Sequence, residues 1–184
     1  MSAASIELRR LTPEDAALYR EIRLEALADS PDAFSSTLEI EQDRLLDWFA
    51  ARLADALVLG AFSGPRLMGV VGFYVQTGPK HAHKGTLWGM YVRPEYRAAG
   101  AGRTLVEAII DHARAHVELL QLMVVSGNLP ALRLYAGLGF VEYGLERRAT
   151  KYRGRYHDEV LMALPLVIGS DASVPRAWTE EVSA

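Results

Sequence analysis

The chain has 184 residues, of which half are apolar and 23% are charged, and this length and mixture are typical of one globular domain rather than of a disordered chain. The formal charge of −3 excludes a strong overall field for nucleic acid or an acidic membrane, so any polyanion site has to be local. The absence of cysteine excludes disulfides, thiolate zinc sites and cysteine nucleophiles.

The chain is predicted to form one domain over residues 6–166. Residues 1–5 precede it as a flexible N-terminus without the basic segment and apolar stretch of a secretory signal. No apolar run of about 18 residues follows, which favours a cytoplasmic protein without a membrane partner. Residues 167–184 lose all periodicity and are expected to form a mobile tail.

The first part of the domain is predicted to form one strand and two helices. Residues 6–11 alternate apolar and polar side chains, and Thr12 and Pro13 are typical of a helix start. This helix is expected to continue to about Asp29, with an apolar side formed by Ala17, Leu18, Ile22, Leu24, Ala26 and Leu27. A second helix is expected over about residues 40–54, with a buried stripe of Leu45, Leu46, Trp48, Phe49 and Leu53. The loop between the helices could line a substrate groove.

The middle of the domain is rich in strands. Residues 56–76 contain two apolar runs separated by hairpin residues, which predict antiparallel strands. A third strand over residues 86–92 stops before Pro94. Residues 101–117 have the pattern of an amphipathic helix. Residues 119–125 form a nearly continuous apolar run, which is typical of a strand covered on both faces.

The end of the domain is predicted to form a short helix over about residues 129–136 that ends at Gly137, followed by a hairpin around Arg153-Gly154-Arg155. All elements together predict an α/β (α+β) fold with a twisted, mostly antiparallel sheet of six to seven strands flanked by about four helices.

The chemistry of the chain is concentrated where the strand over residues 86–92 runs through RPEYRAAGAG into the long helix. A strand that turns on glycines into a helix presents unpaired backbone N–H groups and the positive end of the helix dipole to one point, where phosphate binds. Gly100 and Gly102 leave room for an anion to approach the backbone, and Arg97 and Arg103 add charged donors.

Two common phosphate-binding motifs do not fit this turn. A P-loop needs glycine where Arg97 stands and lysine where Arg103 stands. A dinucleotide fingerprint needs a third glycine at position 105, which is Leu105. A third pattern, Arg/Gln-x-x-Gly-x-Gly/Ala, is matched at Arg97-Ala98-Ala99-Gly100-Ala101-Gly102.

With its flanks, this hexapeptide resembles the core motif of the GNAT superfamily of N-acetyltransferases. The stretch YVRPEYRAAGAGRTLVEAII is similar to that motif from strand end to helix. The stretch VSGNLPALRLYAGLGFVEYG is similar to the motif that follows it in the family. The resemblance covers about residues 6–166 and is strongest over residues 85–145. It implies the GNAT form of the fold predicted above.

The resemblance implies an enzyme that binds acetyl-CoA as cosubstrate together with a primary amine of a small molecule or peptide, and lets the amine attack the thioester directly. The diphosphate would be held by Arg97, Ala98, Ala99, Gly100, Ala101, Gly102, Arg103 and Thr104. The pantetheine arm and thioester carbonyl would contact a bulged strand end at Met90, Tyr91 and Val92, and Asn128 would hold a pantetheine amide. Tyr135 would donate a proton to the departing thiolate.

Without the resemblance, these residues have ordinary structural interpretations. Gly100 and Gly102 would form a tight turn, Tyr135 would be a half-buried core aromatic, and Asn128 would be the N-cap of a helix. Two rival functions also stay open. One is transfer of a longer acyl group, decided by the room near Met90 and Trp88. The other is a silent CoA-binding module, against which the presence of Tyr135 argues.

The sequence does not identify the acceptor or the base that deprotonates it. Many family members place a glutamate on the third strand, but TLWGMYV contains none, so proton loss through water stays open. His157, Asp158, Glu39 and Glu41 are candidates from the cleft walls.

Other polar features are expected to be structural. The pairs His112 and His116 and His81 and His83 have metal-compatible spacings, but we interpret all four as surface histidines and expect no metal. The basic segment RRATKYRGRYH is interpreted as a solvated hairpin or a rim facing an anion, and no nucleic-acid partner is expected. The resemblance leaves a homodimer through the C-terminal hairpin open.

Overall fold

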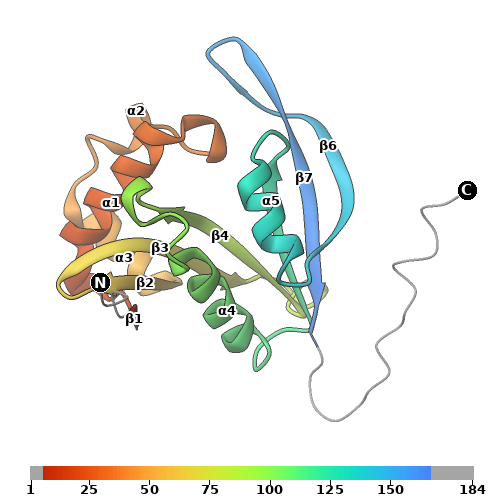
Figure 1. The fold of residues 1–184 in the computed structure, drawn as a ribbon, viewed down its shortest axis with the longest axis horizontal. Coiled ribbons are helices and arrows are strands. Elements are labelled where there is room, and N and C mark those ends of the chain that lie inside the picture. Colours follow the sequence, from red (N-terminus) through yellow and green to blue (C-terminus); the bar gives the residue numbers. More distant parts are fainter. Residues whose placement is uncertain (1–5, 167–184) are drawn as a thin grey trace, which may run out of the picture.

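The computed structural model describes residues 6–166 (Figure 1), and the expected N-terminal segment and tail lie outside the described residues. The sheet has seven strands in the order β1-β2-β3-β4-β5-β7-β6. The strands are β1 (Glu7–Arg10), β2 (Leu57–Ser63), β3 (Arg66–Val75), β4 (Lys84–Val92), β5 (Leu119–Val125), β6 (Val141–Tyr152) and β7 (Arg155–Pro165). The α-helices are α1 (Ala16–Asp29), α2 (Leu38–Glu41), α3 (Leu46–Asp55), α4 (Ala101–Ala113) and α5 (Leu129–Ala136), and the 3-10 turns are η1 (Pro13–Asp15), η2 (Pro31–Ala33) and η3 (Pro94–Tyr96). The predicted α+β fold class is confirmed.

The pairing of β4 with β5 opens the sheet at its centre. All other neighbouring strands are antiparallel, whereas β4 and β5 are parallel. They pair only where Lys84–Thr86 lies beside Leu119–Gln121. Beyond Thr86, β4 continues to Val92 with β3 on one side, and on its other side it has no strand partner within the described residues. The two strands therefore diverge toward their C-terminal ends.

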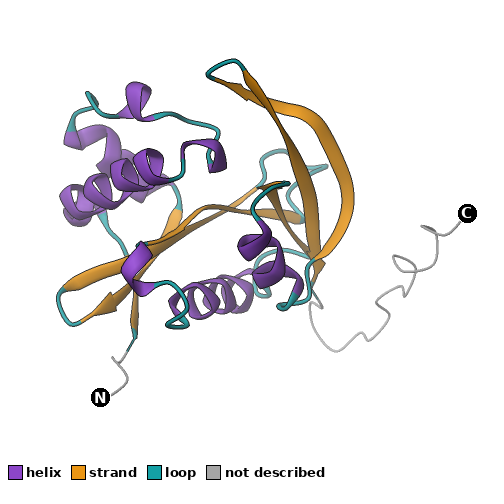
Figure 2. Cartoon of the chain, turned by 45° about the horizontal axis from the view of Figure 1, so that its top comes forward, coloured by secondary structure: helices purple, strands orange, loops and turns teal. Residues whose placement is uncertain are grey.

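Two hydrophobic clusters lie on opposite faces of the sheet, and Figure 2 shows helices on both sides of it. One cluster joins α4 to β5 and β7, and α4 contributes its predicted apolar face with Leu105, Val106, Ile109, Ile110 and Ala113 fully or nearly fully buried. The other lies under α1 and α3, where Tyr19, Ile22, Phe49 and Leu53 are buried. Burial of these side chains is the main force that fixes both helix layers on the sheet.

The second predicted helix is wrong in its extent and in part of its face. The chain forms the short α2 and then a turn before α3, and Leu45 becomes the extended N-cap residue of α3 with φ −70 and ψ 159. Leu45 is 78% exposed and Leu46 is 49% exposed, whereas Phe49 and Leu53 are buried. Helical spacing is not kept across a turn, so the two leucines leave the buried stripe.

Two further predictions need correction. The long amphipathic helix ends at Ala113, and residues 114–117 form a turn in which Val117 is still buried. The strand β5 is covered on one face only. Leu120, Leu122 and Val124 are buried, but Met123 is 59% exposed. An apolar run therefore does not by itself show that both faces of a strand are covered, because β5 turns its second face to the cleft described below.

The C-terminal hairpin is confirmed at the predicted turn and carries a bulge in β6. The register of β6 against β7 shifts between Glu146 and Thr150, and Arg148 takes a positive φ of 55°. The backbone N–H of Arg148 donates to Asp158 Oδ1 at 2.8 Å, which stabilises the bulge. Within residues 6–166, no helix combines the length and the apolar character needed to cross a bilayer.

Candidate active site

A cavity of about 580 Å³ lies where β4 and β5 diverge. One wall is the end of β4 together with the turn that leads into α4, and the other is β5 with the start of α5. Ser30, Ala33 and Phe34, which follow α1, also border it. The residues from the two walls include Trp88, Met90, Tyr91, Val92, Arg97, Ala98, Gly100, Gly102, Arg103, Met123, Val125, Asn128 and Tyr135. Most of the residues predicted from sequence are thus brought to one cavity.

The turn before α4 leaves several backbone amides free. The amides of Arg97, Ala99 and Thr104 donate to carbonyl oxygens of Pro94, Tyr96 and Gly100. Within the described part of the chain, the structure gives no hydrogen-bond partner to the amides of the five other residues, Ala98, Gly100, Ala101, Gly102 and Arg103. These amides stand at the positive end of a 13-residue helix, which is an arrangement that binds phosphate.

Glycine is needed at one position of this turn, and a second glycine is closely packed. Gly100, the N-cap residue of α4, has a φ of +90°, a conformation that residues with a Cβ rarely adopt. A Cβ at Gly102 would lie 3.2 Å from Met90 Cε, the end of a flexible side chain, so a small shift of Met90 would make room for it. The start of α4 therefore lies close to the end of β4.

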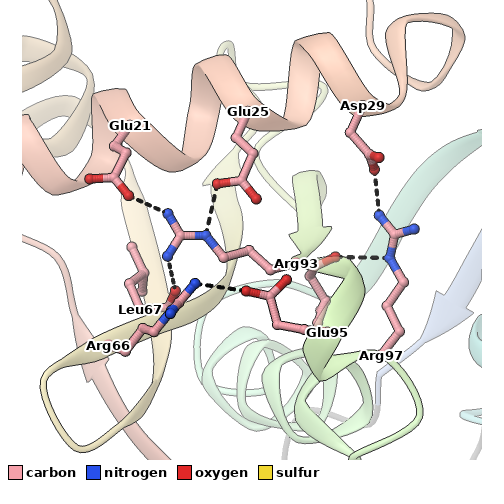
Figure 3. A network of polar contacts seen from close by, with 9 residues as sticks. Glu21, Glu25, Asp29, Arg66, Leu67, Arg93, Glu95 and Arg97 are labelled. Carbon is pink, nitrogen blue, oxygen red and sulfur yellow. Dashed lines mark hydrogen bonds and ion pairs between the residues drawn. The ribbon is translucent and has the colours of Figure 1, made fainter.

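The two arginines of the turn are held by protein groups at its flanks. Arg97 donates through Nη2 to Asp29 Oδ2 at 2.6 Å and through Nε to the Val92 carbonyl at 3.0 Å (Figure 3). Arg103 pairs with Glu107 at 3.0 Å. Both guanidinium side chains remain about half exposed, so each keeps donors that face solvent.

A third arginine, Arg93, was not singled out by sequence reasoning. Its side chain is nearly fully buried and donates to Glu21 at 2.5 Å, to Glu25 at 2.8 Å and to the Leu67 carbonyl at 2.9 Å (Figure 3). The contacts join α1 and the start of β3 to the residue that precedes η3. The only feature of the local sequence that could have indicated this role is the position of Arg93 directly between an apolar strand and Pro94. Its hydrogen-bond partners are more than 25 positions away in the sequence.

The end of β4 carries a β-bulge one step earlier than the predicted segment. Trp88 pairs with Gly72 and Tyr91 pairs with Val70, so Gly89 and Met90 together stand opposite one residue of β3. The φ of Gly89 is +62°. Tyr91 and Val92 follow in regular pairing with β3. Bulges redirect the chain locally, and this one lies against the cavity.

Two buried tyrosines border the cavity with hydroxyl groups that make no hydrogen bond to residues 6–166. Tyr135 of α5 packs edge-on against Phe140, with ring centroids 5.7 Å apart. Burial raises the pKa of the Tyr135 phenol far above its usual range, which keeps it protonated at neutral pH. Burial first, and then the charges of Asp29 and Glu25, raise the pKa of Tyr91 to about 12.

Asn128 has the structural role that its position suggests. Its Oδ1 accepts from the amide of Ala131 at 3.3 Å and caps α5. The side chain is only partly exposed and borders the cavity. The cap uses the oxygen, so the amide nitrogen is available to a ligand.

The side chains considered as bases are largely engaged. Glu41 is buried in a two-bond ion pair with Arg23, at 2.8 and 2.9 Å. Glu39 lies 3.3 Å from Arg153 and 3.2 Å from the Tyr152 hydroxyl. Asp158 holds the β6 bulge, and His157 Nε2 lies 3.5 Å from Asp32 Oδ1.

The histidine pairs form no metal cluster in the described ranges. His112 and His116 stack with ring centroids 4.2 Å apart. His112 is half buried rather than at the surface, because it packs edge-on against Phe73. Burial, and then the neighbouring His116, lower its pKa. His81 and His83 are exposed as predicted.

The sequence is similar to acetyltransferases. The family model described as acetyltransferase (GNAT) family matches residues 19–140. The ribosomal protein bS18-alanine N-acetyltransferase of Escherichia coli is 37% identical over 82 residues, which are 44% of this chain and 55% of that protein. Phosphinothricin N-acetyltransferase of Alcaligenes faecalis is 34% identical over 101 residues, 53% of this chain and 51% of that one. The chain spans about half the length of the curated relatives it matches.

Solved structures share the fold. A GNAT-family acetyltransferase from Streptococcus pneumoniae superposes with a TM-score of 0.77 at 24% identity, covering 88% of this chain and 100% of that one. The Salmonella typhimurium protein yncA, solved with its cofactor acetyl-CoA, superposes with a TM-score of 0.76 at 24% identity, covering 94% of this chain and 98% of that one.

Proposed function

Because this chain belongs to the GNAT family of acetyltransferases, we propose that it transfers an acetyl group from acetyl-CoA to a primary amine of a small molecule or peptide. The observation that carries the proposal is the set of five free amides at the N-terminus of α4, four of which belong to residues that border a cavity between diverging strands. Free amides at a helix N-terminus suit a diphosphate. The cosubstrate supplies the activated acyl group, and the chain supplies binding, orientation and proton transfer.

The turn residues 97–104 would hold the diphosphate. The amides of Ala98, Gly100, Ala101, Gly102 and Arg103 are available for this purpose, whereas those of Arg97, Ala99 and Thr104 already have partners. Arg97, Ala99 and Thr104 are thus expected to contribute to diphosphate binding through their side chains or by shaping the turn, not through their amides. The Thr104 hydroxyl, however, donates to the Gly100 carbonyl at 3.1 Å, which supports a role in shaping the turn.

The pantetheine arm would lie along the bulged end of β4. Met90, Tyr91 and Val92 are the residues proposed to contact it, and they border the cavity together with Asn128 on the opposite wall. Backbone groups at a bulge are free from regular pairing. An N–H there could polarise the thioester carbonyl, which is the usual way to stabilise the charge that develops on its oxygen.

Tyr135 is proposed as the acid that protonates the departing thiolate. Its hydroxyl stays protonated because burial raises the pKa, and it has no hydrogen-bond partner in residues 6–166 that would hold the proton. A buried phenol next to a cavity wall is a suitable proton donor for a basic leaving group. The same hydroxyl argues against the rival function of a CoA-binding module without activity.

The decisive experiment has two arms. Calorimetry with acetyl-CoA tests the donor site, and absence of binding would overturn the proposal. Release of free thiol from acetyl-CoA, measured with a panel of amines, tests the transfer. The panel comprises spermidine, L-alanine, phosphinothricin and a peptide that begins with alanine, the last two because of the acceptors named for similar proteins. A donor panel with longer acyl groups tests the room near Met90 and Trp88.

A further inference from the structure

The register of β5 and β7 places one carboxylate next to a strand that borders the cavity. Val125 pairs with Glu159, and Met123 pairs with Leu161. The alternate pair, Val124 and Val160, is buried in the cluster under α4 and α5. Successive side chains of a strand point to opposite faces. Glu159 therefore lies on the same face as Val125 and Met123. Both of these border the cavity, as do Leu122 and Val124 of the other face of β5, whereas the lining includes no residue of β7. Glu159 is thus one strand away from the cavity wall, next to Val125.

Residues after α1 cover this face of β7. His157 precedes Glu159 by two positions and so shares its face. The His157 ring lies 3.5 Å from Asp32 of η2, and the next residues, Ala33 and Phe34, border the cavity. Figure 1 shows the hairpin of β6 and β7 standing across from α2. Glu159 thus lies on the face of the sheet opposite the cluster under α4 and α5, the same face on which His157 contacts Asp32 of η2.

Among residues 6–166, Glu159 and its cross-strand neighbour Glu146 both lack a cation, whereas Asp158 lies 3.9 Å from Arg147. Glu159 is partly buried, and it makes no ion pair or hydrogen bond with any residue of the range 6–166. The residue of β6 that pairs with Glu159 is Glu146, another carboxylate. Burial first, and then the charge of Glu146, raise the pKa of Glu159. A raised pKa makes the Glu159 carboxylate a stronger base than an ordinary glutamate.

The charged groups that face Glu159 are few. β6 contributes Glu146, which pairs with Glu159, and β5 contributes the uncharged Val125. β7 contributes His157, which contacts Asp32 of η2. The nearby Arg147 lies 3.9 Å from Asp158. A cationic ammonium group that enters this region meets Glu159 and Glu146, neither of which has a counterion among residues 6–166.

We propose that Glu159 is the general base of the transfer, an inference that rests on the proposed function. The carboxylate takes one proton from the acceptor ammonium group, and the neutral amine then forms a bond to the thioester carbonyl carbon. As the carbon–sulfur bond breaks, Tyr135 donates its hydroxyl proton to the sulfur. The nitrogen, now bonded to the acetyl carbon, then gives its second proton to the Tyr135 phenolate, which becomes neutral again. Glu159 releases its proton to solvent, so one proton is released for each acetyl group transferred.

The test is a pH profile of thiol release with the panel amine that the wild type acetylates fastest. In Glu159→Gln the carboxylate is lost while the side-chain size is kept. We expect kcat/KM to fall by about 100-fold at pH 7, the usual order for a general base, and the deficit to shrink as the pH approaches the pKa of the amine itself. Equal rates and equal profiles in the two proteins would overturn the inference.

Two further variants sharpen this test. Glu146→Gln removes the negative charge that disfavours the ionised form of Glu159, so the pKa of Glu159 is expected to fall. The acidic limb of the pH profile of kcat/KM is therefore expected to move to lower pH. Glu142→Gln changes an exposed carboxylate elsewhere on β6 and is expected to leave the profile unchanged. An acidic limb that stays in place in Glu146→Gln would count against Glu159 as the titrating group.

Binding and spectroscopy separate this inference from the proposed function. Acetyl-CoA is expected to bind Glu159→Gln as it binds the wild type, because Glu159 is not a donor contact, and a loss of binding would contradict the assignment. Carbon-13 NMR of the Glu159 carboxyl is expected to give a titration midpoint above the ordinary glutamate pKa of about 4.3. In Glu146→Gln this midpoint is expected to be lower than in the wild type. An ordinary midpoint would overturn the inference alone, whereas a wild type that acetylates no amine would overturn the proposed function as well.

Discussion

Arg97 of the turn before α4 forms an ion pair with Asp29 at the end of α1, with Nη2 and Oδ2 2.6 Å apart. The pair joins the turn that is proposed to hold the diphosphate to the end of α1. The residues that follow Asp29 include Ser30, Ala33 and Phe34, which border the same cavity as the turn. The hydrogen bond from Arg97 is the largest of the influences that lower the pKa of Asp29, so the carboxylate stays charged at neutral pH. Asp29 therefore competes with an anionic ligand for Arg97.

Removing this competition should strengthen donor binding. In Asp29→Asn the guanidinium of Arg97 is released and one negative charge near the turn is lost, so acetyl-CoA is expected to bind up to about 5-fold more tightly, as is usual for an exposed charge pair. Arg97→Ala is expected to weaken binding. Calorimetry at two salt concentrations measures both effects, and the gain in Asp29→Asn should decrease at high salt. Weaker binding by Asp29→Asn would contradict this account of the pair.

Filling the space at Gly102 should impair the donor site. A Cβ at this position would lie 3.2 Å from Met90 Cε, and the additional methyl groups of valine would separate the turn from β4. Gly102→Val is expected to bind acetyl-CoA at least about 10-fold more weakly, a loss of about 1.4 kcal/mol or more. Gly144→Ala on β6, where a Cβ meets only Leu161 at ordinary contact distance, serves as the control and should bind normally.

Tyr135→Phe tests the proposed acid. The ring and its packing against Phe140 are kept, and only the hydroxyl is lost. We expect kcat to fall by about 100-fold or more with little change in KM for acetyl-CoA. Because burial raises the pKa of the phenol, the wild-type rate should show no alkaline decline at the ordinary tyrosine value of about 10. Tyr74→Phe, at an exposed position of β3, is the control. Equal kcat in Tyr135→Phe and wild type would exclude the acid role.

Arg93 is expected to matter for stability more than for chemistry. Replacing it with alanine leaves the Leu67 carbonyl and Glu25 without their partner. Breaking a buried charge pair costs about 3–5 kcal/mol, and because Glu21 and Glu25 are partly exposed we expect about 2–3 kcal/mol, measured by urea unfolding. Arg66→Ala removes an exposed pair with Glu95 and should cost less than about 1 kcal/mol. Equal losses would show that burial of Arg93 contributes little.

The stability of Glu159→Gln can be predicted from the sign of its pKa shift. The pKa is raised in the folded protein, so the charged form is disfavoured by folding, and this penalty is present above the folded-state pKa and disappears at low pH. At pH 7 the variant should therefore melt at a temperature equal to or above that of the wild type. Its advantage should decrease as the pH is lowered toward 4. A clear loss of stability at pH 7 would indicate a favourable contact of Glu159.

Features encoded by neighbouring residues were correctly predicted from the sequence. The amphipathic face of α4, the hairpins and the turn with Gly100 and Gly102 depend on spacing over a few positions. The position of Asn128 before Leu129 and Pro130 likewise indicated the cap that the structure contains. The glycine turn before α4 was therefore recognisable from the sequence before its geometry was known.

The sequence by itself determined most of the elements, their order and the glycine turn before α4, because these follow from local periodicity and steric freedom. Only the tertiary structure decided that Leu45 is exposed, that β5 has one open face, that Arg93 reaches α1, and that Glu159 lies between Glu146 and Val125 in the sheet. The physical reason is that each of these depends on a partner distant in the chain. Strand register and packing between distant segments depend on many contacts at once, so they cannot be predicted from a short stretch of residues.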